Sequence, residues 1–180
     1  MKIERVIVGR LLCNCYLLSY GEKVLIIDPG DNYEMIVEKI GKREVVGVIV
    51  THRHFDHIGA LSMIVDKYKV KVYDRSNLVN GWNVIDVFKF IVIYTPGHKE
   101  DAITIYFKDD KVMFCGDFIF RDSIGRWDLE GGNIQEMCRS ILEIKKYDRD
   151  IIIYPGHGDK TTLGYEMDNN IYFRDDVKYF

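Results

Sequence analysis

The stretch THRHFDHIG, residues 51–59, gathers side chains that bind metal ions. It contains three of the chain's five histidines together with an aspartate. Neutral imidazole is the commonest metal ligand in proteins, and a structural reason for so dense a cluster of titratable groups is hard to find. The spacing H-x-H-x-D-H therefore indicates a metal site rather than a solvated loop.

The two remaining histidines stand in similar places. His98 ends the sequence TPGH and His157 lies in PGHG, and each follows an apolar run. Asp117 also follows such a run, but it is the weakest candidate because a Gly-Asp step is common in turns. If these strands end at one edge of a sheet, their loops bring seven side chains together. The seven are His52, His54, Asp56, His57, His98, Asp117 and His157.

Seven nitrogen and oxygen ligands exceed the four of a closed tetrahedral zinc site, and structural zinc sites generally include cysteine. The set suits two metal ions that share a bridging carboxylate. Two ions about 3.5 to 4 Å apart can generate hydroxide near neutral pH and polarise the bond that it attacks. The cysteines are expected instead as buried reduced thiols, because they are sparse and lie in apolar surroundings. They are Cys13, Cys15, Cys115 and Cys138.

Other chemistries have less support. Ser62 and Ser123 lack the G-x-S-x-G context of a serine hydrolase, and the glycine-rich pieces SIGR and LEGG lack the lysine of a phosphate-binding loop. Asp28 begins the step DPG, which most simply forms a turn. The alternative is that Asp28 supports a metal ligand without binding the metal itself. Three aromatic residues are expected in packing, with a substrate-lining role for one of them as the alternative. They are Phe118, Phe120 and Trp127.

The elements that must position these residues are short strands alternating with helices. The Gly21-Glu22 step predicts a tight hairpin turn, and the apolar spacing before Gly41 predicts a helix that ends there. The expected strands cover 4–8, 14–20, 23–30, 45–50, 70–74, 89–94, 102–107, 111–117 and 151–155. The expected helices cover 33–40, 57–68, 133–146, with Asn133 as N-cap and Glu136 three residues on, and 162–169.

The whole chain fits one mixed α/β layered domain over residues 1–180. A domain of this length buries roughly 70% of its unfolded surface, so it needs no metal merely to fold. The 25 Lys+Arg and 28 Asp+Glu give a formal charge of -3, and no basic run marks a nucleic-acid track. Charged residues interrupt the N-terminal stretch, and no run of about 18 apolar residues predicts a membrane span. We expect a cytoplasmic protein that acts on a small molecule, without nucleic-acid or membrane partners.

The order THRHFDHIG, TPGH, GDFIF and YPGHG resembles that of the metallo-β-lactamase-fold hydrolases over essentially the whole chain. Within that superfamily, GDFIFRDSIGRWDLEGGN followed by PGHGDKTT resembles the glyoxalase II-like branch, the hydroxyacylglutathione hydrolases and their short relatives. The resemblance implies a four-layer αββα sandwich with a metal site at one edge of the sheets. Only 23 residues follow His157, so a short form without the C-terminal, glutathione-binding helical domain of glyoxalase II is expected.

The resemblance also implies a role for each ligand. One metal ion would be held by His52, His54 and His98, the other by Asp56, His57 and His157, with Asp117 bridging them. Zinc is the first expectation, with iron and manganese as alternatives, because imidazole and carboxylate do not choose among them. A bridging hydroxide would attack a thioester such as S-lactoylglutathione or a related acyl-thiol. Asp56 or Asp117 would accept its proton, and Arg126 is a weak candidate for binding a substrate carboxylate.

Three alternatives stay open at this stage. A persulfide dioxygenase-like enzyme of the same fold would use one iron held by His52, His98 and Asp117. Other hydrolases of the fold act on a different ester or on a lactone. A non-catalytic metal-binding protein is the third, although its complete ligand set argues against it.

Overall fold

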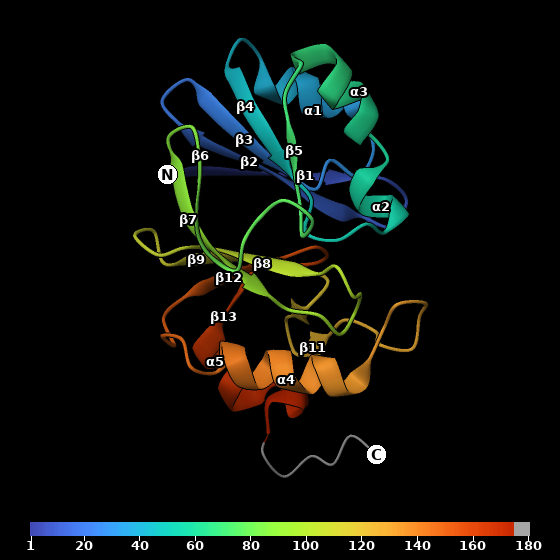
Figure 1. The fold of residues 1–180 in the computed structure, drawn as a ribbon, viewed down its shortest axis with the longest axis vertical. Coiled ribbons are helices and arrows are strands. Elements are labelled where there is room, and N and C mark those ends of the chain that lie inside the picture. The colour runs from blue at the N-terminus through green and yellow to red at the C-terminus, as the bar shows by residue number, and fades with distance from the viewer. Residues whose placement is uncertain (175–180) are drawn as a thin grey trace.

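Two facing β-sheets with helices on their outer faces form the protein, seen in a computed structural model that describes residues 1–174 (Figure 1). The first sheet contains, in spatial order, β1 (Lys2–Val8), β2 (Cys13–Tyr20), β3 (Lys23–Ile27), β4 (Glu44–Ile49) and β5 (Val72–Tyr73). The second contains β13 (Thr161–Thr162), β12 (Ile152–Pro155), β9 (Val112–Gly116), β8 (Ile103–Phe107), β7 (Phe88–Tyr94) and β6 (Gly81–Ile85). A small hairpin adds β10 (Ile119–Phe120) and β11 (Ser123–Ile124).

The helices form the two outer layers. They are α1 (Tyr33–Ile40), α2 (Phe55–Ile58), α3 (Leu61–Tyr68), α4 (Ile134–Ile144) and α5 (Leu163–Asn169), followed by a 3-10 turn at Ile171–Phe173. Figure 1 shows α1 and α3 over the first sheet and α4 and α5 over the second. The predicted four-layer αββα sandwich is therefore confirmed. Within residues 1–174 no helix combines the length and the apolar character needed to cross a bilayer.

Several local predictions are confirmed. Gly21 takes a φ of 57°, and the pairing of Tyr20 with Lys23 closes β2 and β3 into a hairpin. Helix α1 ends at Gly41, whose N–H donates to the Val37 carbonyl. Asn133 caps α4, because its side-chain oxygen accepts from the N–H of Glu136 at 3.0 Å.

The predicted helix 57–68 is wrong, because the chain makes two helices there. Helix α2 ends at Ile58, and α3 begins at Leu61. The Ala60 N–H donates to the Pro29 carbonyl at 3.0 Å, and a Cβ at Gly59 would lie only 2.2 Å from the Gly30 carbonyl oxygen. The loop after β3 thus contacts the break and separates the helices.

Strand β6, the two-residue strand β13 and the β10–β11 hairpin were not predicted. β6 lies at the edge of the second sheet, and two of its apolar residues, Trp82 and Val84, are exposed. Its apolar residues therefore do not all lie on the buried face. The hairpin has two residues per strand, too few for an alternating pattern to be visible.

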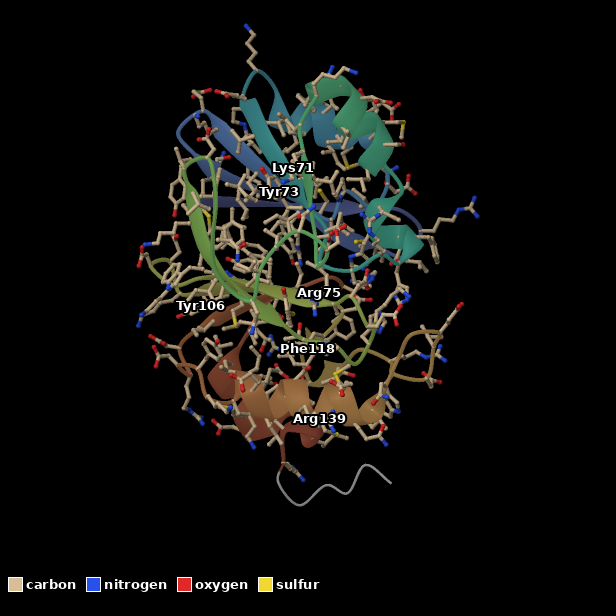
Figure 2. All side chains as sticks on the ribbon, viewed as in Figure 1. Lys71, Tyr73, Arg75, Tyr106, Phe118 and Arg139 are labelled. Carbon is tan, nitrogen blue, oxygen red and sulfur yellow. The ribbon has the colours of Figure 1, made fainter. Side chains whose placement is uncertain are left out.

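The core has one layer between the sheets and one under each pair of helices. Phe88, Phe90, Phe107 and Phe114 fill the central layer. Phe118 lies between the second sheet and α4 (Figure 2). It belongs to a buried cluster that includes Met137 and Ile141 of that helix.

The ends of four strands meet at one edge of the sandwich. β7 and β9 are both antiparallel to β8, and β12 is parallel to β9, so these three strands run the same way. β4 belongs to the other sheet, and the loop after it is linked to the second sheet by the Ile103 N–H, which donates to the Thr51 carbonyl at 2.9 Å. The ligand loops therefore come from two sheets, and not from the single sheet edge considered above.

Candidate metal centre

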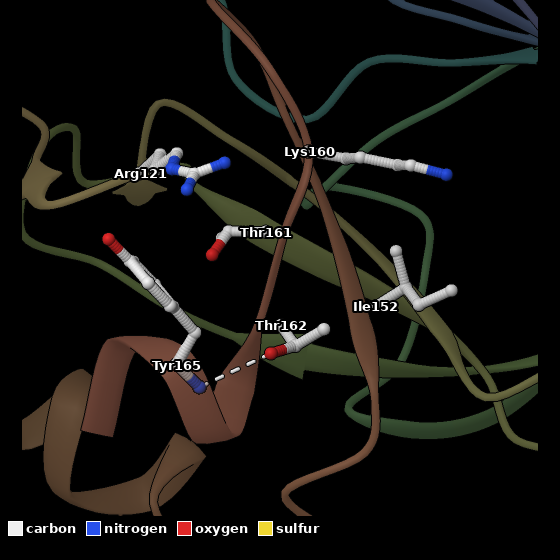
Figure 3. Close-up of a pocket in the computed structure, with 6 residues that line it drawn as sticks. All are labelled: Arg121, Ile152, Lys160, Thr161, Thr162 and Tyr165. Carbon is white, nitrogen blue, oxygen red and sulfur yellow. Dashed lines mark hydrogen bonds between the residues drawn. The ribbon is translucent and has the colours of Figure 1, made fainter. Parts of the chain in front are cut away.

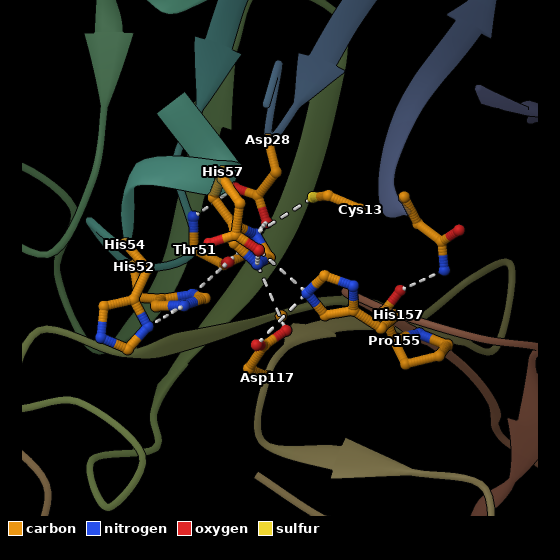
Figure 4. Close-up of polar contacts among 12 residues, drawn as sticks. Cys13, Asp28, Thr51, His52, His54, His57, Asp117, Pro155 and His157 are labelled. Atoms are coloured by element: carbon orange, nitrogen blue, oxygen red, sulfur yellow. Dashed lines mark hydrogen bonds and ion pairs between the residues drawn. The ribbon is translucent and has the colours of Figure 1, made fainter. Parts of the chain in front are cut away.

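All seven predicted ligand side chains converge at this edge. Figure 4 labels His52, His54, His57, Asp117 and His157 among them. His52, His54, Asp56 and His57 come from the loop after β4 and from α2. His98, Asp117 and His157 follow β7, β9 and β12 of the second sheet. The cluster thus spans the gap between the two sheets.

Three histidines form one half of the cluster. His54 Nδ1 lies 3.1 Å from His52 Nε2 and 2.8 Å from His98 Nε2. Donor atoms bound to one tetrahedral zinc at about 2.0–2.1 Å lie about 3.3 Å from one another. Both distances are shorter than that value, so the three nitrogens are close enough to share one ion after a small outward shift.

The other half contains Asp56, His57 and His157. Asp56 Oδ2 lies 3.1 Å from His157 Nε2 and 3.8 Å from His57 Nε2. This half is buried at His57, which is 0% exposed, and opens to solvent at His157.

Asp117 lies between the halves. Its Oδ1 is 3.3 Å from His57 Nε2, while its Oδ2 is 3.6 Å from His98 Nε2 and 3.5 Å from His157 Nε2. One carboxylate thus faces ligands of both groups, although a Gly-Asp step was the weakest of the sequence signals.

Hydrogen bonds to carbonyl oxygens orient two of the imidazoles. His98 Nδ1 donates to the Arg126 carbonyl at 2.7 Å, and His157 Nδ1 donates to the Leu11 carbonyl at 3.0 Å. A carbonyl oxygen only accepts, so each Nδ1 carries a proton and each Nε2 faces the centre as the candidate metal-binding atom.

Asp28 does the same for His57. Its Oδ2 accepts from His57 Nδ1 at 2.9 Å, and the carboxylate also accepts from the Thr51 N–H at 2.8 Å and the Thr51 hydroxyl at 2.6 Å. Asp28 is buried, with a φ of 50°. The interpretation of Asp28 as a turn residue was therefore incomplete, and its position directly after an apolar strand was the available signal.

A cation fits the centre better than protein groups alone do. His57 Nε2 and Asp117 Oδ1 are buried and lack a hydrogen-bond partner within residues 1–174, although they lie 3.3 Å apart. Leaving a buried polar atom unpaired costs about 1–3 kcal/mol. An ion held by both atoms would satisfy them.

The electrostatics of the centre also favour cations. Burial raises the pKa of Asp117, but the neighbouring His157 and His57 outweigh it and hold the pKa well below its usual range. Burial and the neighbouring His57 lower the pKa of His52. Burial lowers the pKa of His157, whereas Asp117 and Asp56 raise it to about 10. The site therefore contains ionised carboxylates and a proton on His157 that a metal ion would displace.

Gly156 leaves room for the cluster. A Cβ at this position would lie 2.2 Å from Asp117 Oδ1 and 2.7 Å from His57 Cε1. No side chain can occupy that space without moving a predicted ligand.

An open mouth of about 390 Å³ leads to the centre. Arg126 lines it, but its guanidinium donates to both carboxylate oxygens of Asp128 at 2.9 Å. Of the three aromatic residues singled out in the sequence, Phe120 lines the mouth, Phe118 is buried in the core, and Trp127 packs against the core while partly exposed.

The four cysteines lie outside the set of seven candidate ligands. Cys13, Cys15 and Cys115 are buried and free as expected, and Cys138 is free but only half-buried. Cys13 Sγ lies 3.7 Å from His57 Nδ1, on the side of the ring that faces Asp28. A separate cavity of about 250 Å³ lies beside β13 and α5 (Figure 3). None of the seven candidate ligands lines it.

The sequence matches the description "Metallo-beta-lactamase superfamily" over residues 8–82 and 83–157. The chain belongs to this superfamily. A superfamily of metallo-hydrolases agrees with the fold and with the His/Asp cluster.

Two relatives are similar over most of the chain. Probable metallo-hydrolase YqgX of Bacillus subtilis (strain 168) is 30% identical to this chain. The alignment covers 94% of this chain and 96% of YqgX. Hydroxyacylglutathione hydrolase of Francisella tularensis subsp. novicida (strain U112) is also 30% identical, covering 87% of this chain and 68% of the relative.

Solved structures agree with the fold. The B3 metallo-β-lactamase BLEG-1 superposes with a TM-score of 0.92 at 29% identity, covering 96% of this chain and 99% of that one. TTHA1623 in a di-iron-bound form superposes with a TM-score of 0.87 at 28% identity. The superposition covers 94% of this chain and 99% of the TTHA1623 chain.

Proposed function

We propose that this protein is a hydrolase that holds two divalent metal ions and cleaves a thioester, S-lactoylglutathione or a related acyl-thiol. The observation that carries the proposal is the position of Asp117, whose carboxylate faces both halves of the cluster. One ion would be held by His52, His54 and His98, the other by Asp56, His57 and His157, with Asp117 between them. Similarity to hydroxyacylglutathione hydrolase supports the thioester.

Ions in this place would lower the pKa of a water molecule and polarise the carbonyl that it attacks. The chain's own contribution is orientation, because Asp28, the Arg126 carbonyl and the Leu11 carbonyl fix three imidazoles. Asp56 and Asp117 are the carboxylates in position to accept the water proton. A thiolate leaving group, with a thiol pKa of about 8.5, needs little protonation as it departs. The proposal therefore requires no separate general acid.

The ligands determine the identity of the metal only in part. Imidazole and carboxylate bind zinc, iron and manganese alike. Zinc is our first choice, and the di-iron form of the similar protein TTHA1623 supports iron as the alternative.

A persulfide dioxygenase-like enzyme with one iron is the competing function. It would need only His52, His98 and Asp117. The 3.1 Å contact between Asp56 and His157 would then have no role, so the hydrolase accounts for more of the centre.

The test is a substrate panel on the metal-loaded protein. The panel contains S-lactoylglutathione, a neutral thioester, an ester, a lactone and, because of the similarity to BLEG-1, a β-lactam. We expect thioester cleavage that His54→Ala abolishes. Oxygen uptake with glutathione persulfide and no thioester cleavage would identify the oxygenase instead.

A further inference from the structure

The mouth of the metal centre has an apolar rim made of Leu11, Phe55, Phe120 and Leu129. Phe55 is 74% exposed, Leu11 53% and Leu129 40%, so three large apolar side chains face solvent around one opening. Single exposed apolar residues are ordinary, but a group of them around a cavity marks a surface for an apolar ligand.

The backbone places this apolar rim directly over the ligands. Leu11 is held by its carbonyl, which accepts from His157 Nδ1. Phe55 begins α2 between His54 and Asp56. The Phe120 ring lies edge-on to the His157 ring, with centroids 6.1 Å apart. A group bound against the rim is therefore adjacent to the reacting atoms.

Outside the metal centre, the described residues of the mouth offer no free cationic side chain to an anionic substrate. Arg126 is the one Lys or Arg among the described residues that line the mouth, and the Asp128 carboxylate neutralises it through two hydrogen bonds of 2.9 Å. The remaining titratable lining groups are candidate metal ligands. S-lactoylglutathione brings two carboxylates of its own and a polar acyl group, and neither finds a matching group here.

We infer that, if the protein is the thioester hydrolase proposed above, its preferred substrate is a thioester with an apolar acyl chain on an uncharged thiol. The acyl chain would lie against the apolar rim, with its carbonyl at the metal centre. Arg126 would stay paired with Asp128.

The experiment compares acetyl, butanoyl and hexanoyl thioesters of N-acetylcysteamine, a neutral thiol, with S-lactoylglutathione. Each methylene group buried at the rim raises kcat/KM by about two- to fourfold, so four of them give at least about 16-fold from acetyl to hexanoyl. We expect that gain, and a higher kcat/KM for the hexanoyl thioester than for S-lactoylglutathione. A flat or falling series, or faster cleavage of S-lactoylglutathione, overturns the inference.

Two rim variants and one control locate the effect. Phe55→Ser and Leu129→Ser should each reduce the hexanoyl-to-acetyl ratio by at least about threefold, the effect of roughly one methylene. Leu142→Ser, at a position on α4 that is 58% exposed and not among the mouth residues, should keep the wild-type ratio. Rim variants that keep the ratio would contradict the inference, and unchanged thermal unfolding shows that they fold.

Equilibrium binding separates this inference from the proposed function. In ketone analogues a methylene replaces the thioester sulfur, so they cannot be hydrolysed at that bond, and calorimetry measures their affinity. If no thioester is cleaved but the affinity rises with chain length and falls in Phe55→Ser, the hydrolase proposal fails and the apolar site stands. If thioesters are cleaved without any chain-length dependence, the hydrolase stands and the apolar site fails.

Discussion

Asp28 is the residue on which the orientation of His57 depends. Its carboxylate accepts from His57 Nδ1 and from two groups of Thr51, so it holds the ring and the loop after β4 together. Asp28→Asn keeps the shape of the side chain but removes its charge. We expect metal affinity to fall about 10- to 100-fold, as it does when such supporting partners are changed.

A competition titration with a chelating dye measures this affinity. Asp31→Asn is the matched control, since Asp31 is exposed and lies three residues further along the chain. Equal affinities for the two variants would show that Asp28 does not support the metal ligands.

Gly156 is the second residue whose identity the centre requires. Its Cβ would overlap Asp117 Oδ1 and crowd His57, so Gly156→Ala should remove bound metal while leaving the sheets intact. Elemental analysis and circular dichroism measure the two effects. Gly158→Ala is the control, because its φ of 73° imposes strain but its Cβ meets nothing within 4 Å. Similar metal loss in both variants would contradict crowding by the Gly156 Cβ as the cause.

The clustering of the seven candidate ligands could be predicted from the sequence, whereas most of the contacts around them could not. Histidine is rare in this chain, and its position after apolar strands carries a strong signal. Gly156 and Asp28 belong to PG and DPG steps, which occur in ordinary turns. Their roles depend on contacts with residues far away in the sequence, which spacing alone does not reveal.

At the scale of elements, the break between α2 and α3 positions Asp56 and His57. A Cβ at Gly30 would lie 1.8 Å from the Asp56 carbonyl oxygen, so the loop after β3 packs against the α2 backbone. Helical spacing alone predicted one continuous helix over 57–68. The close backbone contact that divides it is a tertiary effect, which local propensity does not contain.

An ion pair ties β1 to the loop between α1 and β4. Arg43 donates to Glu4 at 2.6 Å and to the Ser19 hydroxyl at 2.8 Å. Burial raises the pKa of Glu4, but Arg43 and Lys2 outweigh it and lower the pKa below its usual value. The stabilisation from this carboxylate is therefore complete above the unfolded pKa of about 4.3, and it is lost as the pH falls through the lower folded pKa.

Glu4→Gln should lower the free energy of unfolding by about 1 kcal/mol at pH 7. The difference from the wild type should shrink as the pH falls below about 4, because the wild-type carboxylate is then protonated too. Urea unfolding at several pH values measures both effects. Glu38→Gln, at an exposed position of α1, is the control and should show neither. A Glu4→Gln difference that stays constant down to pH 2 would contradict the ionic origin.

At the scale of the whole molecule, the candidate centre connects the two sheets. Four of its side chains follow β4 of the first sheet, and three follow strands of the second. The layered class could be predicted, because apolar strands alternate with helical patterns and the motifs resemble a known fold. The division of the ligand loops between two sheets could not, since apolar runs carry no mark of the sheet that they join.

Metal binding should therefore stabilise the entire sandwich. At a free metal concentration about 1,000 times Kd, binding adds about 4 kcal/mol to the free energy of unfolding, or roughly 10 °C in Tm for a chain of this length. Chelation should lower the Tm of the wild type by that amount, with a much smaller effect on His54→Ala. Calorimetry in the presence and absence of chelator measures it. A Tm that is indifferent to chelation would mean that no ion links the sheets.

The metal content of the purified protein tests the central claim most directly. The protein is prepared without chelator, saturated with zinc, freed of excess metal and analysed for metal per chain. We predict two ions per chain for the wild type and fewer for Asp117→Ala, which lacks the carboxylate between the two halves. One ion per chain, or a wild-type value that Asp117→Ala retains, would contradict a two-metal centre bridged by Asp117.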